Sequence, residues 1–241
     1  MTRLLSAMKT DACVQVRNNL YAVGAASGII TAVVLAQLAG ADSLSSAIPA
    51  AVLLVTGGMA MLYVMGLIIF EKDEGTLSAT IVSPLRTSEY LWSKILTLSV
   101  LALFETVISV GGAMLVIGRS QELALPNIPV LLVGTLAIGV IYTLAGIIIV
   151  VRHARITSAL IPMGTIGAVL QLPALHFLGW FEHPAFLFIP TSAPTMLVRG
   201  AFVQLEMSEW VYAVVTTVVM VFGLSLWARH AFSKYIVMRT G

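Results

Sequence analysis

Long stretches almost free of charged side chains constrain the fold of this chain. Six of them are separated by charged breaks, and only the third contains an acid, Glu105; they cover residues 18–41, 43–70, 95–118, 123–151, 156–181 and 210–228. A helix needs about 20 mostly apolar residues to cross the hydrocarbon core of a bilayer. We therefore predict an all-α membrane protein with six transmembrane helices, at about 20–38, 48–70, 95–117, 128–151, 156–175 and 210–228.

The composition excludes an ordinary soluble domain. Hydrophobic residues make up 59% of the chain and charged residues 10%, whereas a typical soluble domain has about 25% charged residues. The first stretch is not a cleavable signal, because its apolar run is longer than a signal core and no clear small-residue cleavage site follows it. The single Cys13 cannot form an internal disulfide. We predict one transmembrane domain over residues 1–241, with nothing that indicates nucleic-acid binding.

Lysine and arginine are distributed unevenly over this topology. With the N-terminus inside, eleven of the 13 basic residues fall in inner segments, and only Arg119 and Arg199 fall in outer ones. The eleven are Arg3, Lys9, Arg17, Lys72, Arg86, Lys94, Arg152, Arg155, Arg229, Lys234 and Arg239. Cytoplasmic loops carry the excess of basic residues in membrane proteins. We therefore predict a multi-pass protein of the cell membrane with both termini in the cytoplasm.

Residues 1–19 form a separate element. Leu5, Met8, Ala12 and Val16 recur at helical spacing, which predicts an amphipathic helix in the inner membrane interface; a short basic lead-in to the first span is the alternative. The first span then carries small residues at four-residue intervals, namely Gly24, Gly28, Ala32 and Ala36. Small residues in this register let another helix approach closely. The pattern leaves open whether that helix belongs to the same chain or to a second subunit.

Residues 176–209, before the sixth span, are too apolar for a solvated loop and too rich in proline for a straight span. Their aromatic and proline residues include Trp180, Phe181, Pro184, Phe186, Phe188, Pro190 and Pro194. We predict a re-entrant or interfacial segment on the outer side. The fifth span contains Pro162 and ends near Pro173, so we expect a kinked or broken helix there.

The longest inner loop, residues 71–94, has the most informative pattern. Charged side chains crowd the point where the second span leaves the membrane, and Gly75, a helix-compatible stretch and Pro84 follow. Thr87 or Ser88 is suited to cap a turn that leads into the third span. This construction predicts a small, rigid cytoplasmic element between two spans, able to transmit a push from a soluble partner. An interfacial loop without a partner is the alternative.

This loop resembles the pattern of ABC-2 type (ABCG-like) transporter permeases. The resemblance covers most of the chain and rests on the acid-rich run from Glu71 to Glu74, Gly75-Thr76-Leu77, Ser83-Pro84-Leu85, and Lys94 at the start of the third span. Three further motifs are most similar to the small permeases of actinobacterial fluoroquinolone exporters: Met1-Thr2-Arg3-Leu4, Phe70-Glu71-Lys72 and Ile189-Pro190-Thr191.

The resemblance implies a transport subunit and not an enzyme. Such a permease works in an ATP-driven exporter, moving a hydrophobic or amphipathic small molecule or a lipid-like cargo by alternating access. Its implied partners are two ATPase subunits, a second copy or a related permease, and membrane lipids. The implied coupling residues are Glu71, Glu74, Gly75, Thr76, Leu77, Pro84 and Arg86. Because the sequence contains no G-x-x-x-x-G-K-[ST] phosphate loop, ATP and Mg²⁺ are expected on the partner and no cofactor on this chain.

Three residues inside the spans are candidate pathway residues: Glu105, Met163 and Gln171. An ionisable group within a membrane span is costly and is by default a functional candidate. Structural pairing with a neighbouring helix is the other interpretation of Glu105. An ion-coupled secondary transporter that uses Glu105 is the alternative function for the whole chain.

An intramembrane enzyme is the less favoured alternative. It would pair Glu71 with Glu74 and use His176 as a base, but the predicted topology places these groups on opposite sides of the membrane. His176 and His183 flank an aromatic stretch without a convincing third or fourth metal ligand. We therefore expect neither a catalytic nor a metal site.

Overall fold

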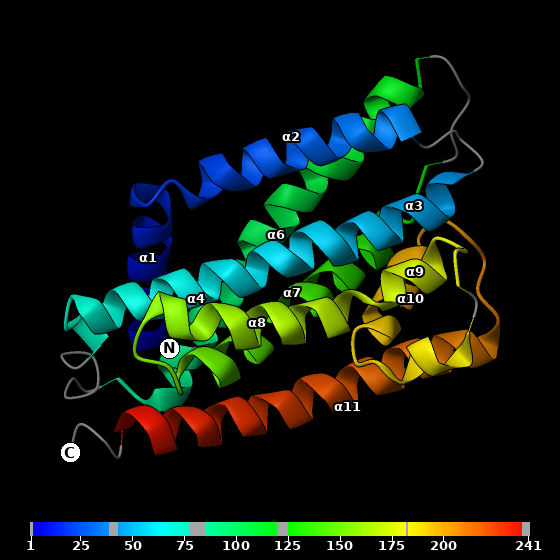
Figure 1. The fold of residues 1–241 in the computed structure, drawn as a ribbon. Coiled ribbons are helices and arrows are strands. Elements are labelled where there is room, and N and C mark those ends of the chain that lie inside the picture. The colour runs from blue at the N-terminus through cyan, green and yellow to red at the C-terminus, as the bar shows by residue number, and fades with distance from the viewer. Residues whose placement is uncertain (1, 39–42, 78–84, 120–124, 182, 238–241) are drawn as a thin grey trace.

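Helices form all the regular secondary structure of the described residues. The structure is a computed structural model that describes residues 2–38, 43–77, 85–119, 125–181 and 183–237 (Figure 1). The α-helices are α1 (Thr2–Arg17), α2 (Leu20–Leu38), α3 (Leu44–Ala51), α4 (Gly58–Asp73), α6 (Thr87–Ile117), α7 (Ile128–Val150), α8 (Ile156–Gln171), α9 (Pro173–Phe177), α10 (Ser192–Arg199) and α11 (Met207–Phe232). Short π-helical segments η2 (Val52–Gly57) and η4 (Ser233–Val237) and a 3₁₀ turn, η3 (Pro184–Phe188), complete them.

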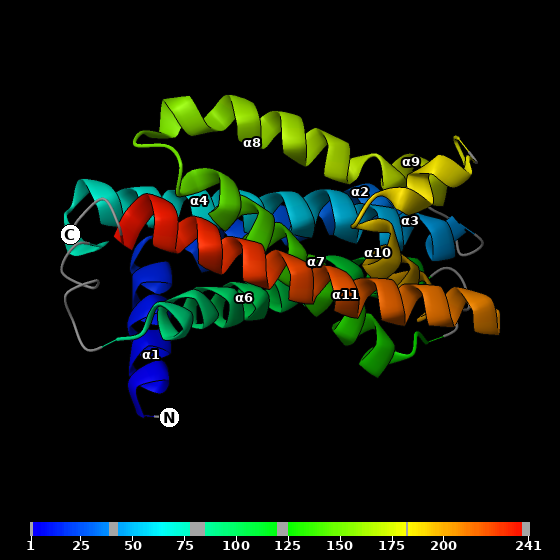
Figure 2. The same ribbon diagram turned by 90° about the horizontal axis from the view of Figure 1, so that it is seen from below.

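Six helical segments of the described residues are long and apolar enough to cross a membrane. They are Leu20–Leu38, Leu44–Asp73, Thr87–Ile117, Ile128–Val150, Ile156–Phe177 and Met207–Ile236. This confirms the predicted all-helical class and the number of spans. Helix α7 occupies the middle of the bundle, in contact with α4, α6, α8, α10 and α11. Figure 2 shows α8 along one flank of the bundle, on the other side from α6 and α1.

Helix α2 packs closely along α6. A Cβ atom added to Gly28 would lie 3.0 Å from the backbone oxygen of Glu105, and one added to Gly24 would lie 3.5 Å from Leu101. The Cβ atom of Ala32 would be 2.9 Å from a Cβ atom placed on Gly112 of α6. The groove of small residues on α2 is therefore filled by a helix of the same chain.

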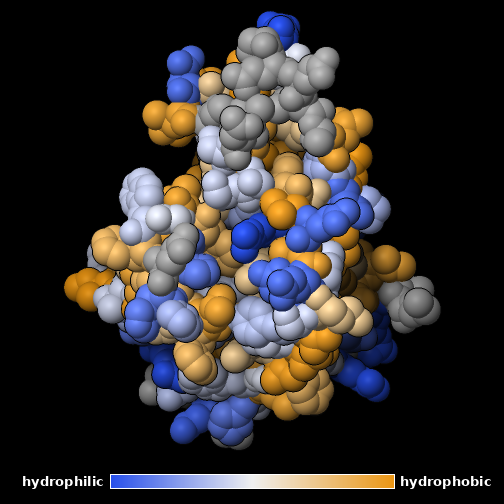
Figure 3. Space-filling view, turned by 90° about the vertical axis from the view of Figure 1, so that its right-hand side faces the viewer, coloured by the Kyte–Doolittle hydropathy of each residue, from blue (hydrophilic) through white to orange (hydrophobic). Residues whose placement is uncertain are grey.

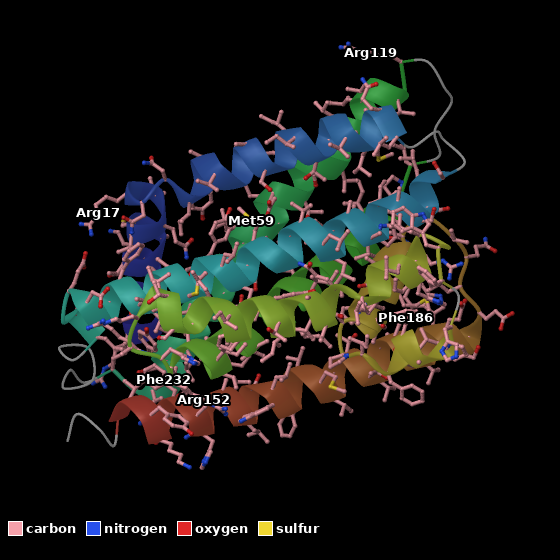
Figure 4. All side chains as sticks on the ribbon, in the orientation of Figure 1. Arg17, Met59, Arg119, Arg152, Phe186 and Phe232 are labelled. Atoms are coloured by element: carbon pink, nitrogen blue, oxygen red, sulfur yellow. The ribbon has the colours of Figure 1, made fainter. Side chains whose placement is uncertain are left out.

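The ends of the bundle separate the basic residues. The N-terminal helix, the last turn of α4, the turn between α7 and α8, and the last turns of α11 all lie at one end (Figure 1). Arg17 and Arg152 lie near this end, and Arg119 lies at the opposite one (Figure 4). We call the end near Arg17 and Arg152 the basic end, and the other the opposite end. This arrangement brings together the segments that the sequence assigns to the inner side.

Helix α1 runs across the direction of the spans (Figures 1 and 2). Two of its polar side chains, Asp11 and Gln15, are buried against the bundle. Leu5 and Val16, which belong to the apolar stripe seen in the sequence, are both 62% exposed. The helix therefore buries Asp11 and Gln15 against the protein, beside the partly buried Val14, and leaves Leu5 and Val16 exposed.

Local sequence explains where several helices begin and break. Helix α6 begins at Thr87, before the predicted position 95, because the Glu89 carboxylate accepts a hydrogen bond from the Arg86 backbone N–H at 2.8 Å and caps the first turn. The fifth span breaks at Pro173, where α9 starts, while α8 continues through Pro162. In the second span, Pro49 in α3 lies just before the π-helical η2, which the sequence did not indicate.

The segment before α11 returns into the opposite end of the bundle. Residues Ser192–Val198 of α10 are all buried, and α10 packs on α3, α7 and α11. Figure 3 looks onto this end, where hydrophilic side chains gather in the middle of the face with hydrophobic ones around and among them. Short helices thus cover the ends of the spans in this region.

Cysteine labelling tests the orientation. The single Cys13 is exposed on α1, so in intact cells it should react with a membrane-permeant maleimide and resist an impermeant one. In a Cys13→Ser background, a cysteine at Ala154, exposed in the turn between α7 and α8, should behave like Cys13, and cysteines at Arg119 or Phe181 should react with both reagents. Reaction of Cys13 or Ala154→Cys with the impermeant reagent from outside would contradict the predicted topology.

Candidate functional site

A buried ammonium group joins three helices at the basic end. Lys94 of α6 is 1% exposed and forms ion pairs with Asp11 of α1 and Glu71 of α4. Ser93 also donates a hydrogen bond to Asp11, and the Tyr90 hydroxyl donates one to Glu71 at 2.6 Å. We call these five residues the ionic junction. It holds α1, the end of α4 and the first turns of α6 at one point.

The junction depends on all its charges being present together. Burying an ion removes it from water at a cost of several kcal/mol, which is offset only by well-placed partners. Lys94 has two carboxylate partners, and hydrogen bonds from Ser93 and Tyr90 satisfy further carboxylate oxygens. A little deeper in the bundle, Gln15 Nε2 donates to Thr97 Oγ1 at 2.8 Å and strengthens the attachment of α1 to α6.

A second lysine ties α4 to the end of α7. The Lys72 ammonium donates to the backbone oxygens of Val150 at 2.9 Å and His153 at 2.8 Å, with Val151 at 3.4 Å. Carbonyls at the end of a helix lack partners within it and carry a partial negative charge. Lys72 therefore caps α7 and fastens the last turn of α4 to the turn that leads into α8.

The predicted coupling residues surround the exit of α4. Glu71 belongs to the ionic junction, Glu74 ends α4, and Gly75 has a φ of +70°, a backbone conformation that favours glycine. The Thr76 hydroxyl donates to the Glu71 carbonyl at 3.2 Å, and Leu77 is buried. Arg86 is the N-cap residue of α6. Pro84 lies outside the described residues. The described members thus gather at both ends of the connection between α4 and α6.

A groove of about 840 Å³ lies beside the junction. Its walls come from α1, the end of α4 and the start of α6, and its floor includes Asp11, Glu71 and Lys94. Arg3 and Arg17 line it from α1, and Glu74 and Thr76 line it from the connection after α4. The groove therefore opens onto the same segment that the sequence marks for coupling.

A second groove, of about 440 Å³, lies between the second span and α8. Met163 and Gln171, two of the candidate pathway residues, both line it. Most of the other lining residues are apolar residues or glycines, and they include Leu54, Gly58, Met61, Leu62, Leu160 and Gly164. Gln171 Nε2 donates at 3.1 Å to the backbone oxygen of Leu54 in η2. The chain thus provides an apolar groove with one amide, suited to an apolar or amphipathic molecule.

Glu105, the third candidate pathway residue, lies elsewhere. It is 1% exposed between α2 and α6, and its Oε1 accepts a 2.5 Å hydrogen bond from Ser27. Its Oε2 is buried and has no hydrogen-bond partner among the described residues. Glu105 does not line the groove that contains Met163 and Gln171. The structure therefore separates the acid from that groove and places it at a helix-packing contact.

The residues of the enzyme alternative are not brought together. Glu71 and Glu74 lie at the end of α4 and His176 lies in α9, at the two ends of the bundle (Figure 1). Within the described ranges, no three His, Cys, Asp or Glu side chains gather in a way that could hold a metal ion.

Comparison with known proteins decides the family. Residues 2–240 match the fluoroquinolones export permease protein family. Two curated relatives, from the CDC 1551 / Oshkosh and H37Rv strains of Mycobacterium tuberculosis, are each named fluoroquinolones export permease protein. Each is 32% identical over 250 residues, covering 100% of this chain and 99% of the relative. The chain belongs to the fluoroquinolones export permease family. It is therefore a membrane-spanning transport subunit and not an enzyme, in keeping with the ABC-2 type resemblance.

The sequence analysis of this export permease did not identify three of the five residues of the ionic junction, Asp11, Tyr90 and Ser93. Asp11 lies on a helix that was interpreted from its apolar stripe, and Tyr90 and Ser93 lie in a segment that was assigned to a loop. Lys94 was noted only as the start of the third span. The sequence did offer one signal: Asp11 is the one acid in residues 1–19, and Lys94 lies at the start of a membrane span. Only the fold shows that these two residues pair.

We predict that Lys94→Met destabilises the permease strongly. The substitution leaves Asp11 and Glu71 buried without their cation, and breaking a buried pair in this way costs about 3–5 kcal/mol. Thermal unfolding of the purified permease in detergent measures the loss. Lys9→Met on the exposed face of α1 is the matched control and should change the melting temperature little. Equal effects of the two substitutions would contradict the proposed role of the junction.

We further predict that Glu105→Gln leaves cargo preference and the pH dependence of cargo binding unchanged. The Gln side-chain oxygen can still accept the Ser27 hydrogen bond, so folded yield should fall only slightly, while Glu105→Ala should lower it more. Cargo binding measured at several pH values, with cationic and neutral compounds, should match the wild type. A well-folded Glu105→Gln variant that has lost its preference for cationic over neutral cargo would instead make Glu105 a pathway residue.

Proposed function

We propose that this chain is the membrane-spanning half of an ATP-driven exporter, coupled to separate ATPase subunits through the connection between α4 and α6. The observation that carries the proposal is the ionic junction, in which Glu71 at the start of this connection is bound to Lys94 of α6 and, through it, to α1. A force applied to such a connection reaches three helices at once. Family membership in an export system supports the same function.

The coupling route continues from α4 to the groove. Lys72 adjoins Glu71 and holds the end of α7 and the turn into α8, while α4 and α8 form the two walls of the 440 Å³ groove. A displacement of the connection would therefore reach both walls of the groove. ATP can bias the inward-open and outward-open states only by contacts that differ between them, and this connection is where we place those contacts.

We place the basic end, with both termini, in the cytoplasm of the cell and infer a dimer of permeases. The α4–α8 groove has its walls on a single chain, and apolar side chains of α8 such as Ile161 and Ile166 are exposed beside it. A second permease, identical or related, would complete the pathway, and two ATPase subunits would supply ATP and Mg²⁺. The cargo is a hydrophobic or amphipathic small molecule, of the fluoroquinolone type that the relatives' names state or lipid-like.

Separate measurements of cargo binding, ATP hydrolysis and transport test the division between coupling and pathway. Glu74→Ala removes the acid that ends α4. Gly75→Val places a β-branched side chain at a left-handed backbone position, which costs about 1–2 kcal/mol. Both should leave cargo binding intact while transport and cargo-stimulated ATP hydrolysis fall together. Gly164→Leu, whose Cβ has no atom within 4 Å, should fill the groove and abolish cargo binding instead.

Gly111→Val is the matched control for Gly75→Val. Gly111 also has open space around its Cβ position but lies in the α6 helix, so coupling should survive. If the coupling variants abolish cargo binding in folded protein and leave stimulated hydrolysis intact, the connection is part of the pathway. Transport that an uncoupler stops and vanadate does not affect would favour the ion-coupled alternative over an ATP-driven one.

A further inference from the structure

A polar pocket at the opposite end of the bundle is not used by the proposed coupling or by the α4–α8 groove. It has a volume of about 440 Å³ and is lined by Ser45, Ser46, His176, Phe177, Leu178, Gly179 and Arg199. These residues come from the first turn of α3, from α9 and the turn after it, and from the last residue of α10. Three segments distant in sequence therefore converge on it.

The lining of this pocket offers donors and a positive charge to a ligand. Arg199 forms a long ion pair with Glu209, at 3.9 Å, and about a third of each side chain is exposed. His176 Nδ1 is buried and has no hydrogen-bond partner among the described residues. No acidic residue appears among the described residues that line the pocket. The lining therefore combines a cation with hydrogen-bonding side chains, and its described residues present no opposing carboxylate.

The position of Arg199 also runs against the charge pattern of the chain. Eleven of the 13 basic residues lie in segments assigned to the cytoplasmic side, and only Arg119 and Arg199 lie in outer ones. Positive charge is disfavoured in short outer segments. Arg199 is one of these two exceptions, and it lies in the pocket. Arg119 does not line the pocket, so the two exceptions differ in their surroundings.

Aromatic side chains stand next to the polar groups. The His176 ring meets Phe177 edge-on, with centroids 5.6 Å apart, and lies 6.3 Å from the ring of Phe186. Phe186 lies at the opposite end of the bundle (Figure 4). Ser45 and Ser46 line the pocket from the first turn of α3, where the Ser46 hydroxyl donates to the Ser43 carbonyl at 2.9 Å. A guanidinium, an imidazole and the Ser45 hydroxyl beside aromatic rings match an oxyanion carried by an apolar or aromatic body.

We propose that this pocket binds the carboxylate or phosphate of an amphipathic molecule at the outer side of the permease. Two sources have this chemistry: the carboxylate of a departing cargo and the phosphate of an anionic lipid headgroup. The cargo source rests on the proposed export function, whereas the lipid source does not. Arg199 supplies the positive charge, and His176 supplies a ring nitrogen that can donate when it carries the proton.

The cargo arm of the test compares a fluoroquinolone acid with its methyl ester, which keeps the rings and lacks the carboxylate. Binding to the purified permease in neutral detergent is followed by the fluorescence of the drug. Arg199→Gln should weaken binding of the acid about tenfold, the value of one charge-assisted hydrogen bond, and leave the ester unchanged. Arg119→Gln removes the other outer cation and should have no effect on either compound.

The lipid arm measures the melting temperature in nanodiscs of phosphatidylcholine, with and without phosphatidylglycerol. If the pocket holds a lipid phosphate, phosphatidylglycerol should stabilise the wild type and Arg119→Gln but not Arg199→Gln. Glu209→Gln keeps Arg199 and removes its acidic neighbour, so it separates loss of the ion pair from loss of the cation. It should bind the anion at least as well as the wild type does.

The outcomes are distinct. A specific effect of Arg199→Gln in either arm supports the oxyanion site and identifies its ligand. Identical behaviour of Arg199→Gln and Arg119→Gln in both arms, with both variants folded, overturns it. Failure of the wild type to bind or transport any fluoroquinolone, with the lipid effect present, refutes the fluoroquinolone-type cargo and leaves the oxyanion site standing.

Discussion

The ammonium group of Lys94, buried where the bundle meets the water, is the interaction on which the basic end depends. A lone charge in that position would not be tolerated, so Asp11 and Glu71 must both be brought to it. This requirement fixes α1 across the ends of the spans and fixes the exit of α4 against α6. It also explains why Asp11 of α1 is turned toward the protein, while Leu5 and Val16 stay exposed, where a membrane interface can receive them.

The two lysines at this end have complementary effects. Lys94 binds side-chain carboxylates and joins α1, α4 and α6, whereas Lys72 binds backbone oxygens and joins α4 to α7 and to the turn before α8. Together they connect every helix that flanks the α4–α8 groove to the segment after α4. Ionic and capping contacts are directional and hold a geometry, which apolar packing between lipid-solvated helices does less well because it has many near-equivalent arrangements.

Other contacts are found in the middle and at the opposite end of the bundle. Around Glu105, small residues of α2 bring two backbones together, and the acid lies at this contact with one hydrogen bond, from Ser27. In the second span, Pro49 precedes a π-helical stretch, and Gln171 of α8 bonds a backbone oxygen within that stretch. At the opposite end, short helices cover the spans, and Arg199 and His176 remain incompletely paired.

The sequence by itself determined the helical class, the six spans and the segregation of basic residues, because these depend on local composition and on the length of hydrocarbon to be crossed. It also marked Glu71 and Gly75, whose neighbours in the chain form a recognisable pattern. Only the tertiary structure paired Lys94 with Asp11, carried Lys72 to the end of α7, separated Glu105 from Met163 and Gln171, and brought Arg199 beside His176. Each of these pairings joins residues far apart in the chain, and helix packing, which local periodicity does not encode, decides which faces meet.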